Sequence, residues 1–137
     1  MKTYQPKHIL ITGSPGIGKT TLIKRLFEEA AVLHPVGFYT EEIREGGIRR
    51  GFKLVGHDGR EGILSHVDIS SRYKVGKYRV DVTGFDRFLD TLKISESNSG
   101  LVIIDEIGKM ECFSRKFLSL INQLLQSETK LIATITQ

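Results

Sequence analysis

The segment Gly13–Thr20, GSPGIGKT, restricts the possible folds of this chain more than any other feature of its sequence. It matches the pattern GxxxxGK[ST], in which the glycines let the backbone curl so that several N–H groups point at one anion. The apolar run 7–12 precedes it like a buried strand, and Leu22, Ile23 and Leu26 follow it at helical spacing. A strand, a glycine-rich loop and a helix in this order predict a phosphate-binding loop, with the positive end of the helix at the anion.

Two residues of this loop have specific expected roles. Lys19 can reach the β and γ phosphates of a nucleotide, and the hydroxyl of Thr20 can ligate Mg²⁺. Such a loop also needs a carboxylate at the end of a neighbouring buried strand to help hold the ion. Leu101–Ile104 is the most apolar run of the chain, and Asp105 follows it directly. We therefore predict that Thr20 and Asp105 are the metal ligands.

Glu106 comes one residue after the predicted metal ligand. A carboxylate at this place can orient a water molecule toward the γ phosphate and take its proton. We therefore expect Lys19 and Glu106 to be the catalytic residues. The adjacent pair of Asp105 and Glu106 favours hydrolysis over transfer to another acceptor.

Other polar residues are weaker candidates for the same site. Thr134 and Thr136 end the last apolar run, where a hydroxyl could sense the γ phosphate, although β propensity alone also explains threonine there. One of four basic residues could stabilise the charge that develops on the phosphate, although each is also an ordinary surface residue. These four are Arg44, Arg49, Arg50 and Lys109.

The rest of the chain alternates between strand-like and helix-like segments. Residues 37–65 contain two or three short β-prone runs separated by turns, and residues 78–82 alternate like a strand. Helices are predicted from Thr83 and from Ser114, which are typical N-cap residues. The apolar residues expected to face the core are Phe85, Phe88, Leu89 and Leu92 in the first of these helices, and Phe117, Leu118, Ile121, Leu124 and Leu125 in the second. This alternation, around a β-hairpin-rich insert at 37–82, predicts an α/β fold with a mostly parallel central sheet flanked by helices.

Length, charge and cysteine content narrow the class of protein. A chain of 137 residues suits one domain, 1–137, and no apolar run approaches the ~20 residues of a membrane helix, so we expect no membrane contact. Its single cysteine, Cys112, cannot form an internal disulfide, which favours the cytoplasm. The net charge is +4, and residues 44–79 carry nine basic and four acidic side chains. Such a patch either attracts nucleotide phosphates or nucleic acid, or is a solvated surface.

Three further segments resemble the signature of the THEP1-type nucleoside-triphosphatase family. They are GFYTEEIREGGIRRGF at Gly37–Phe52, VGKYRVDV at Val75–Val82 and IDEIGKME at Ile104–Glu111. The resemblance extends over nearly the whole chain. Family members continue for several tens of residues past the position of Gln137, so we expect the C-terminal portion of the family fold to be absent from this chain.

The resemblance implies a fold and an activity. The fold would be the RecA-like branch of P-loop NTPases, and the activity would be slow Mg²⁺-dependent hydrolysis of nucleoside triphosphates, ATP and GTP among them, with little preference among bases. The products would be nucleoside diphosphate and phosphate, and we expect the enzyme to be a cytoplasmic monomer. The nucleotide-binding residues implied are Gly13, Ser14, Pro15, Gly16, Ile17, Gly18, Lys19, Thr20, Thr21, Ile103, Ile104, Asp105, Glu106, Ile107, Gly108, Lys109 and Met110.

Two alternative functions stay open at this point. A nucleoside or nucleotide kinase could use the same phosphate loop and hold its acceptor on the basic insert 44–79. A nucleotide-dependent nucleic-acid-binding module would explain the same excess of positive charge. Its aromatic residues could stack on bases unless they pack in the core, and these are Phe38, Tyr39, Phe52, Tyr73 and Tyr78.

Overall fold

The apolar runs of the sequence form the central strands of a β-sheet in the computed structural model, which describes residues 8–14 and 16–136. Within these residues the strands are β1 (His8–Ile11), β2 (Val36–Glu45), β3 (Ile48–Gly56), β4 (Glu61–His66), β5 (Lys74–Val75), β6 (Tyr78–Val80), β7 (Leu101–Ile107) and β8 (Lys130–Ile135). Their order across the sheet is β1-β8-β7-β2-β3-β4-β6-β5.

The sheet has a parallel half and an antiparallel half. Strands β1, β8, β7 and β2 are parallel neighbours, whereas β2, β3, β4, β6 and β5 are antiparallel neighbours. The predicted α/β architecture is therefore present, but the sheet is mixed, because the hairpin-rich insert continues the same sheet. Short turns join antiparallel neighbours, whereas parallel neighbours need longer crossovers, here through helices.

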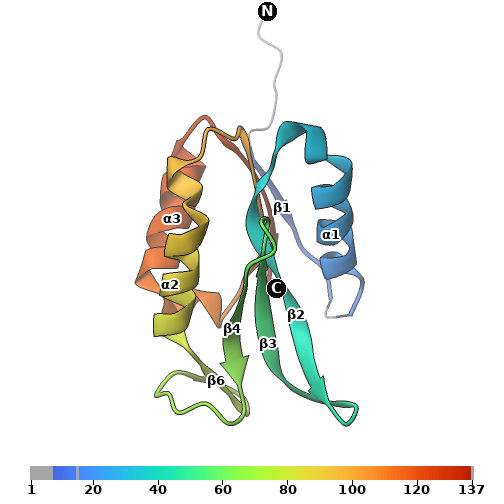
Figure 1. The fold of residues 1–137 in the computed structure, drawn as a ribbon, viewed down its shortest axis with the longest axis vertical. Coiled ribbons are helices and arrows are strands. Elements are labelled where there is room, and N and C mark those ends of the chain that lie inside the picture. Colours follow the sequence, from blue (N-terminus) through green and yellow to red (C-terminus); the bar gives the residue numbers. More distant parts are fainter. Residues whose placement is uncertain (1–7, 15, 137) are drawn as a thin grey trace, which may run out of the picture.

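Helices lie on both faces of this sheet (Figure 1). Helix α1 (Lys19–Glu29) covers one face, and α2 (Val82–Leu92) and α3 (Arg115–Gln126) lie side by side on the other. The described residues also contain three single turns of 3₁₀ helix, at Ala31–Leu33, Ile94–Glu96 and Glu111–Phe113. Within the described residues, no helix is both long enough and apolar enough to span a bilayer.

The helix starts confirm one predicted cap and correct the other. Ser114 caps α3, since its hydroxyl accepts a hydrogen bond from the Phe117 N–H at 2.9 Å. The predicted cap at Thr83 is wrong, because α2 begins at Val82 and Asp81 accepts from the Gly84 N–H at 2.9 Å. An aspartate side chain caps as well as threonine does, and here it comes two residues earlier.

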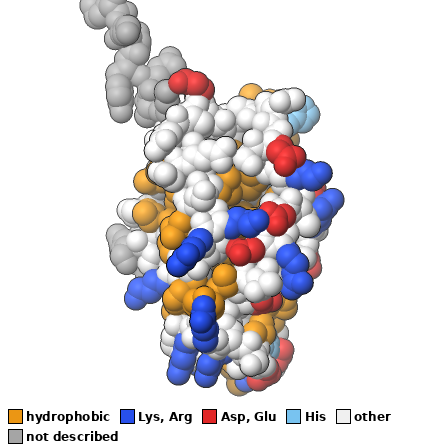
Figure 2. All heavy atoms as spheres, turned by 90° about the vertical axis from the view of Figure 1, so that its left-hand side faces the viewer, with side chains coloured by type: hydrophobic (Ala, Val, Ile, Leu, Met, Phe, Trp, Pro, Cys, Tyr) orange, Lys and Arg blue, Asp and Glu red, His pale blue; other side chains and the backbone are white. Residues whose placement is uncertain are grey.

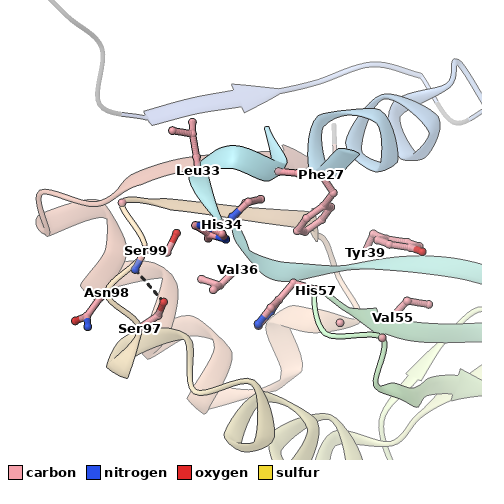
Figure 3. Close-up of a pocket in the computed structure, with 15 residues that line it drawn as sticks. Phe27, Leu33, His34, Val36, Tyr39, Val55, His57, Ser97, Asn98 and Ser99 are labelled. Atoms are coloured by element: carbon pink, nitrogen blue, oxygen red, sulfur yellow. Dashed lines mark hydrogen bonds between the residues drawn. The ribbon is translucent and has the colours of Figure 1, made fainter. Parts of the chain in front are cut away.

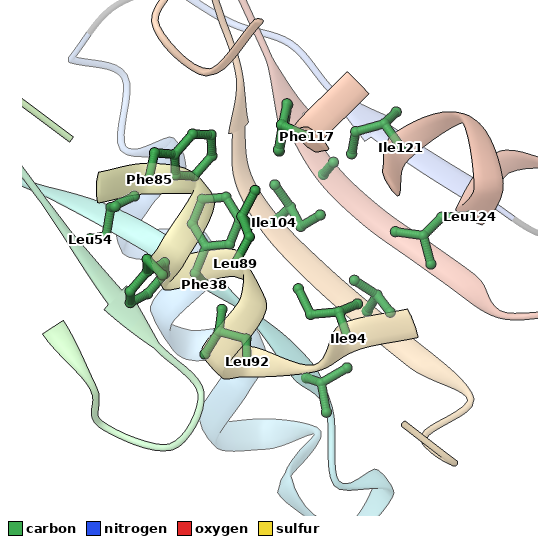
Figure 4. Packing of buried hydrophobic residues seen from close by; sticks show 14 of the residues in the cluster. Phe38, Leu54, Phe85, Leu89, Leu92, Ile94, Ile104, Phe117, Ile121 and Leu124 are labelled. Atoms are coloured by element: carbon green, nitrogen blue, oxygen red, sulfur yellow. The ribbon is translucent and has the colours of Figure 1, made fainter. Parts of the chain in front are cut away.

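The core lies between the sheet and the pair α2 and α3, and it is centred on aromatic rings (Figure 4). Phe38 of β2 is fully buried and makes edge contacts with Phe85 and Phe117, at centroid distances of 5.7 and 6.2 Å. The expected core face of α2 is confirmed. On α3, however, Leu118 and Leu125 are 45% and 43% exposed, because they lie beside the stripe that faces the sheet.

Gly37 allows the two halves of the sheet to join. Its φ is 138°, and it pairs with Ile103 where β2 lies against β7. A Cβ at this position would overlap the backbone carbonyl of Ile103. Only glycine combines this backbone angle with such a close approach of two main chains.

Glu111 is a carboxyl group inside the fold, only 3% exposed. It lies in the 3₁₀ turn that follows β7. Burial raises the pKa of Glu111 to about 8, and the negative charges of Glu106 and Asp105 add to this rise. The side chain is therefore protonated in the folded protein at neutral pH.

Replacing Gly37 by alanine should destabilise the protein by at least ~2 kcal/mol, because the new Cβ is strained and meets Ile103. Urea unfolding measures this change. Gly100→Ala is the matched control, since no atom lies within 4 Å of its added Cβ, and it should shift stability by less than ~1 kcal/mol. Equal effects of the two substitutions would contradict this account.

The stability of the wild-type protein should fall as pH rises from about 5 to 8. The folded state keeps the proton of Glu111 over this range, whereas an unfolded glutamate near pKa 4.5 has lost it, so rising pH favours unfolding by up to about 1.4 kcal/mol per pH unit. Glu111→Gln mimics the protonated form and should flatten this slope. Denaturant unfolding of both proteins at pH 5, 6.5 and 8 measures this dependence of stability on pH. An unchanged dependence in the variant would show that another group is responsible.

Candidate active site

The phosphate loop connects β1 to α1 and has the backbone that its glycines predict. Gly16 and Gly18 have φ angles of 80° and 103°, a region that other residues rarely adopt. No side chain caps the start of α1 after Gly18, so the first N–H groups of the helix face the loop without a side-chain partner. The amino group of Lys19 donates to the Gly13 carbonyl at 2.8 Å, which places this cation inside the curl. The loop therefore presents amides, a helix N-terminus and an ammonium group at one point.

Asp105 lies directly beside this loop. Its Oδ2 accepts a hydrogen bond from the Thr20 hydroxyl at 2.9 Å, and its side chain is almost completely buried. Strand order explains the contact, because β8 pairs with both β1 and β7 and brings the carboxyl ends of all three strands to one edge. The predicted metal ligands Thr20 and Asp105 are thus neighbours in space.

Thr134 also binds Asp105. This fully buried residue of β8 donates its hydroxyl to Asp105 Oδ1 at 2.6 Å. Its hydroxyl thus contacts the carboxylate, in contrast to the expected contact with a γ phosphate. With Thr20 on one oxygen and Thr134 on the other, the carboxylate is held in one orientation.

Glu106 is half-buried at the same edge of the sheet. Burial raises its pKa above that of an ordinary glutamate, and the negative charge of Asp105 raises it further. The charge of Lys19 and a hydrogen bond from Thr136 act in the opposite direction. A carboxylate with a raised pKa is a better proton acceptor than an exposed one, which suits a general base.

A cavity of about 610 Å³ unites these groups. The predicted residues that line it are Gly13, Gly16, Gly18, Lys19, Thr20, Thr21, Asp105 and Glu106. A smaller cavity of about 190 Å³ shares Glu106 and Thr136 with it and adds Lys109, Met110 and Val75. Together they form a polar space over the phosphate loop and a more apolar space beyond Glu106.

The other expected nucleotide-binding residues lie outside these cavities or outside the described residues. Ile103 and Ile104 are fully buried on opposite faces of β7, so they support Asp105 from below and cannot touch a bound nucleotide with their side chains. The remaining residues outside both linings are Ser14, Ile17, Ile107 and Gly108. Pro15 lies outside the described residues.

Sequence reasoning missed one wall of the larger cavity. Thr40, Glu41 and Glu42 of β2 and Phe52 of β3 line it opposite the phosphate loop. The feature that could have revealed these residues is the position of β2. This strand runs parallel to β7 and ends at the same edge of the sheet. Glu41 is bound by Lys24 of α1 at 2.7 Å, and this ion pair lowers the pKa of Glu41.

Of the four basic candidates, Arg49 lines the larger cavity. Its Nε donates to the Tyr78 hydroxyl at 2.7 Å, and its guanidinium lies 5.3 Å from the centre of the Phe52 ring. Glu42 binds it at 3.3 Å. Arg44 is bound by Glu42 and Arg50 by Asp68, and neither arginine lines this cavity. Lys109 lines the smaller cavity.

Another cavity, of about 840 Å³, lies at the opposite end of the sheet (Figure 3). Its lining includes Val36, which begins β2, and Gly100, which precedes β7, so it opens at the amino ends of the parallel strands. His34 and His57 point into the space between the strands and the loop around Ser99. None of the predicted site residues lines it, so the chemistry places the candidate site in the 610 Å³ cavity over the phosphate loop.

Comparison with known proteins gives consistent matches. A family model described as "NTPase" matches residues 8–137. The nucleoside-triphosphatase THEP1 of Thermotoga sp. strain RQ2 is 48% identical over 128 residues, which cover 93% of this chain and 72% of that protein. The human cancer-related nucleoside-triphosphatase is 40% identical over 138 residues, covering 92% of this chain and 73% of its own length.

The fold matches as well. The crystal structure of THEP1 from Aquifex aeolicus superimposes with a TM-score of 0.79 and 36% identity, and the match covers 94% of this chain and 76% of that one. The predicted P-loop NTPase fold is thereby confirmed. From the phosphate loop, the supporting strand order and these matches, it follows that this chain belongs to the THEP1-type nucleoside-triphosphatase family.

Proposed function

We propose that this protein hydrolyses nucleoside triphosphates to nucleoside diphosphate and phosphate in a Mg²⁺-dependent reaction with broad base specificity. The observation that carries the proposal is the 2.9 Å contact between Thr20 of the phosphate loop and Asp105 of β7. It brings the two groups that a P-loop enzyme needs for its metal to one point. The names of the relatives, nucleoside-triphosphatases, support the same reaction.

The residues present fit a magnesium ion. Hydroxyl and carboxylate oxygens are the ligands that Mg²⁺ prefers, and Thr20 and Asp105 offer them side by side. Within the described part of the chain there is no group of three or more His, Cys, Asp or Glu residues suited to a metal. This fits an ion that keeps several waters and takes further oxygens from its substrate's phosphates. When bound, Mg²⁺ neutralises charge on the β and γ phosphates.

The protein's own groups divide the remaining work. The loop amides and the start of α1 hold the phosphates, and Lys19 places a positive charge on the β and γ groups. Glu106 orients a water molecule toward the γ phosphorus and accepts its proton as the new P–O bond forms and the bond to the diphosphate breaks. Glu106 lines both cavities, and Lys19 lines one of them with it. This position favours water as the acceptor of the phosphoryl group.

We assign to Arg49 the stabilisation of charge on the γ phosphate. It lines the same cavity as Lys19 and Glu106, and Tyr78 and Phe52 hold its guanidinium in place. A fixed guanidinium loses little freedom when it binds a phosphate, so its charge acts fully in the transition state. Action as a cytoplasmic monomer stays a prediction from the sequence.

Lys19→Ala and Glu106→Gln should each lower the rate of phosphate release from ATP and GTP by roughly 10²-fold or more. Lys19→Ala should also weaken binding of a fluorescent triphosphate, because it removes a cation that contacts the phosphates. Glu106→Gln should leave binding nearly intact, because it removes only the proton acceptor. Glu96→Gln, which changes a glutamate of the 3₁₀ turn after α2, is the control. Two unaffected rates would refute these roles, and label transferred to a nucleoside acceptor would indicate a kinase instead.

Arg49→Ala should reduce kcat by ~10-fold or more with a smaller change in KM, because its charge acts mainly in the transition state. Arg44→Ala is a close control, since Arg44 faces Arg49 across the hairpin and binds the same Glu42 without lining the cavity. Steady-state kinetics of both variants measure these changes in kcat and KM. Equal losses would mean that the pairing with Glu42 is what matters.

A further inference from the structure

The positive charge of the middle segment is concentrated in one hairpin. Residues 72–79, called the basic hairpin below, contain four basic side chains and no acidic one. They contain β5, a turn at Gly76 and the first two residues of β6, at the far edge of the sheet from β1. The basic residues are Arg72, Lys74, Lys77 and Arg79.

The structure separates these four cations from the other basic residues of the segment. Every basic residue from position 44 to position 60 is paired with a carboxylate, and the pairs are Arg44–Glu42, Arg49–Glu42, Arg50–Asp68, Lys53–Glu61 and Arg60–Asp58. Within the described residues, no ion pair involves the basic hairpin. The excess of positive charge in the sequence is therefore an uncompensated charge on this hairpin.

Neighbouring groups hold three of the four cations in place. Arg72 donates to the Tyr73 hydroxyl at 2.8 Å, and Lys77 lies 5.5 Å from the centre of the Tyr78 ring. Arg79 donates to the Ser71 carbonyl at 2.8 Å. Lys74 and Arg79 face each other across the two strands, so their side chains project from the same face.

The cations also gather on the molecular surface. Figure 2 shows several Lys and Arg side chains at the lower end of the molecule, the end that carries β6 in Figure 1, as well as others at mid-height. Arg72, Lys74 and Lys77 are exposed. The hairpin thus combines a concentrated positive charge with free access from solvent.

The chemistry of the hairpin favours a nucleic-acid backbone over bases or lipid. Its rings pack into the fold, since Tyr78 is 7% exposed and contacts Phe52, and the half-buried Tyr73 contacts Phe113. Among the described residues, the large apolar side chains that are exposed lie in other segments, so the hairpin itself offers none to a membrane. Uncompensated cations without a reading group bind phosphates regardless of sequence.

We propose that the basic hairpin binds the phosphate backbone of nucleic acid, without sequence preference, beside the nucleotide cavity. Val75 of the hairpin lines the smaller cavity with Glu106, and Tyr78 accepts the hydrogen bond from Arg49. A bound strand therefore lies next to the candidate active site. This binding does not depend on the proposed hydrolysis.

Fluorescence anisotropy with a labelled 20-nucleotide oligo-dT, measured between about 50 and 200 mM salt, tests the proposal. The wild-type protein should bind with an affinity that falls steeply with salt. The triple variant Arg72→Gln, Lys74→Gln and Lys77→Gln should lose at least ~10-fold in affinity at low salt. Its slope of log K against log salt should shrink by about 0.7 per cation that contacts a phosphate.

The control removes the same charge from cations that have carboxylate partners. Its changes are Arg25→Gln, Arg60→Gln and Lys116→Gln, and it should bind within about twofold of wild type. Phosphate release from ATP should be unchanged in both triple variants, which separates this test from that of the proposed hydrolysis. Equal losses in the two variants, no measurable binding by wild type, or binding only to vesicles of anionic lipid would overturn the proposal.

Discussion

The arrangement of this protein depends on one buried carboxylate. Asp105 accepts hydrogen bonds from Thr20 and Thr134, which come from the start of α1 and from β8, while Asp105 itself belongs to β7. Three neighbouring segments thus meet at one almost fully buried side chain. A buried charge is costly unless it is hydrogen-bonded, so these contacts both satisfy the carboxylate and align the carboxyl ends of the strands. The same alignment places the phosphate loop beside Glu106.

The mixed sheet gives the candidate site two different walls. The parallel half, β1, β8, β7 and β2, supplies the loop, Asp105 and Glu106 at the carboxyl ends of its strands, where open α/β sheets bind their ligands. The antiparallel half supplies Arg49 and Phe52 from β3 on the opposite side. Strand β2 belongs to both halves, and Gly37 lets it approach β7 closely. The hairpins therefore line the cavity of the candidate site as well as extending the sheet.

The basic side chains of this protein differ in whether they have a carboxylate partner. Around the cavity, Lys24 binds Glu41 and Arg49 binds Glu42, so these cations have carboxylate partners that position them. The basic hairpin at residues 72–79 lacks such partners within the described residues, and its field is not cancelled locally. An uncompensated field attracts polyanions, whereas balanced pairs mainly position side chains. One short segment therefore combines recognition at its surface with contacts to the cavity beneath it.

Local patterns in the sequence determined the chemical groups and most of the elements. GSPGIGKT predicted the loop, the apolar run before Asp105 predicted β7, and Ser114 predicted the start of α3, because each depends on neighbours a few residues apart. Only the tertiary structure decided that Thr134 binds Asp105, that Arg49 faces the cavity and that Ile103 is buried beneath it. The contacts of Asp105 join residues 29 and 85 positions apart, and they depend on strand order, which short-range spacing does not encode.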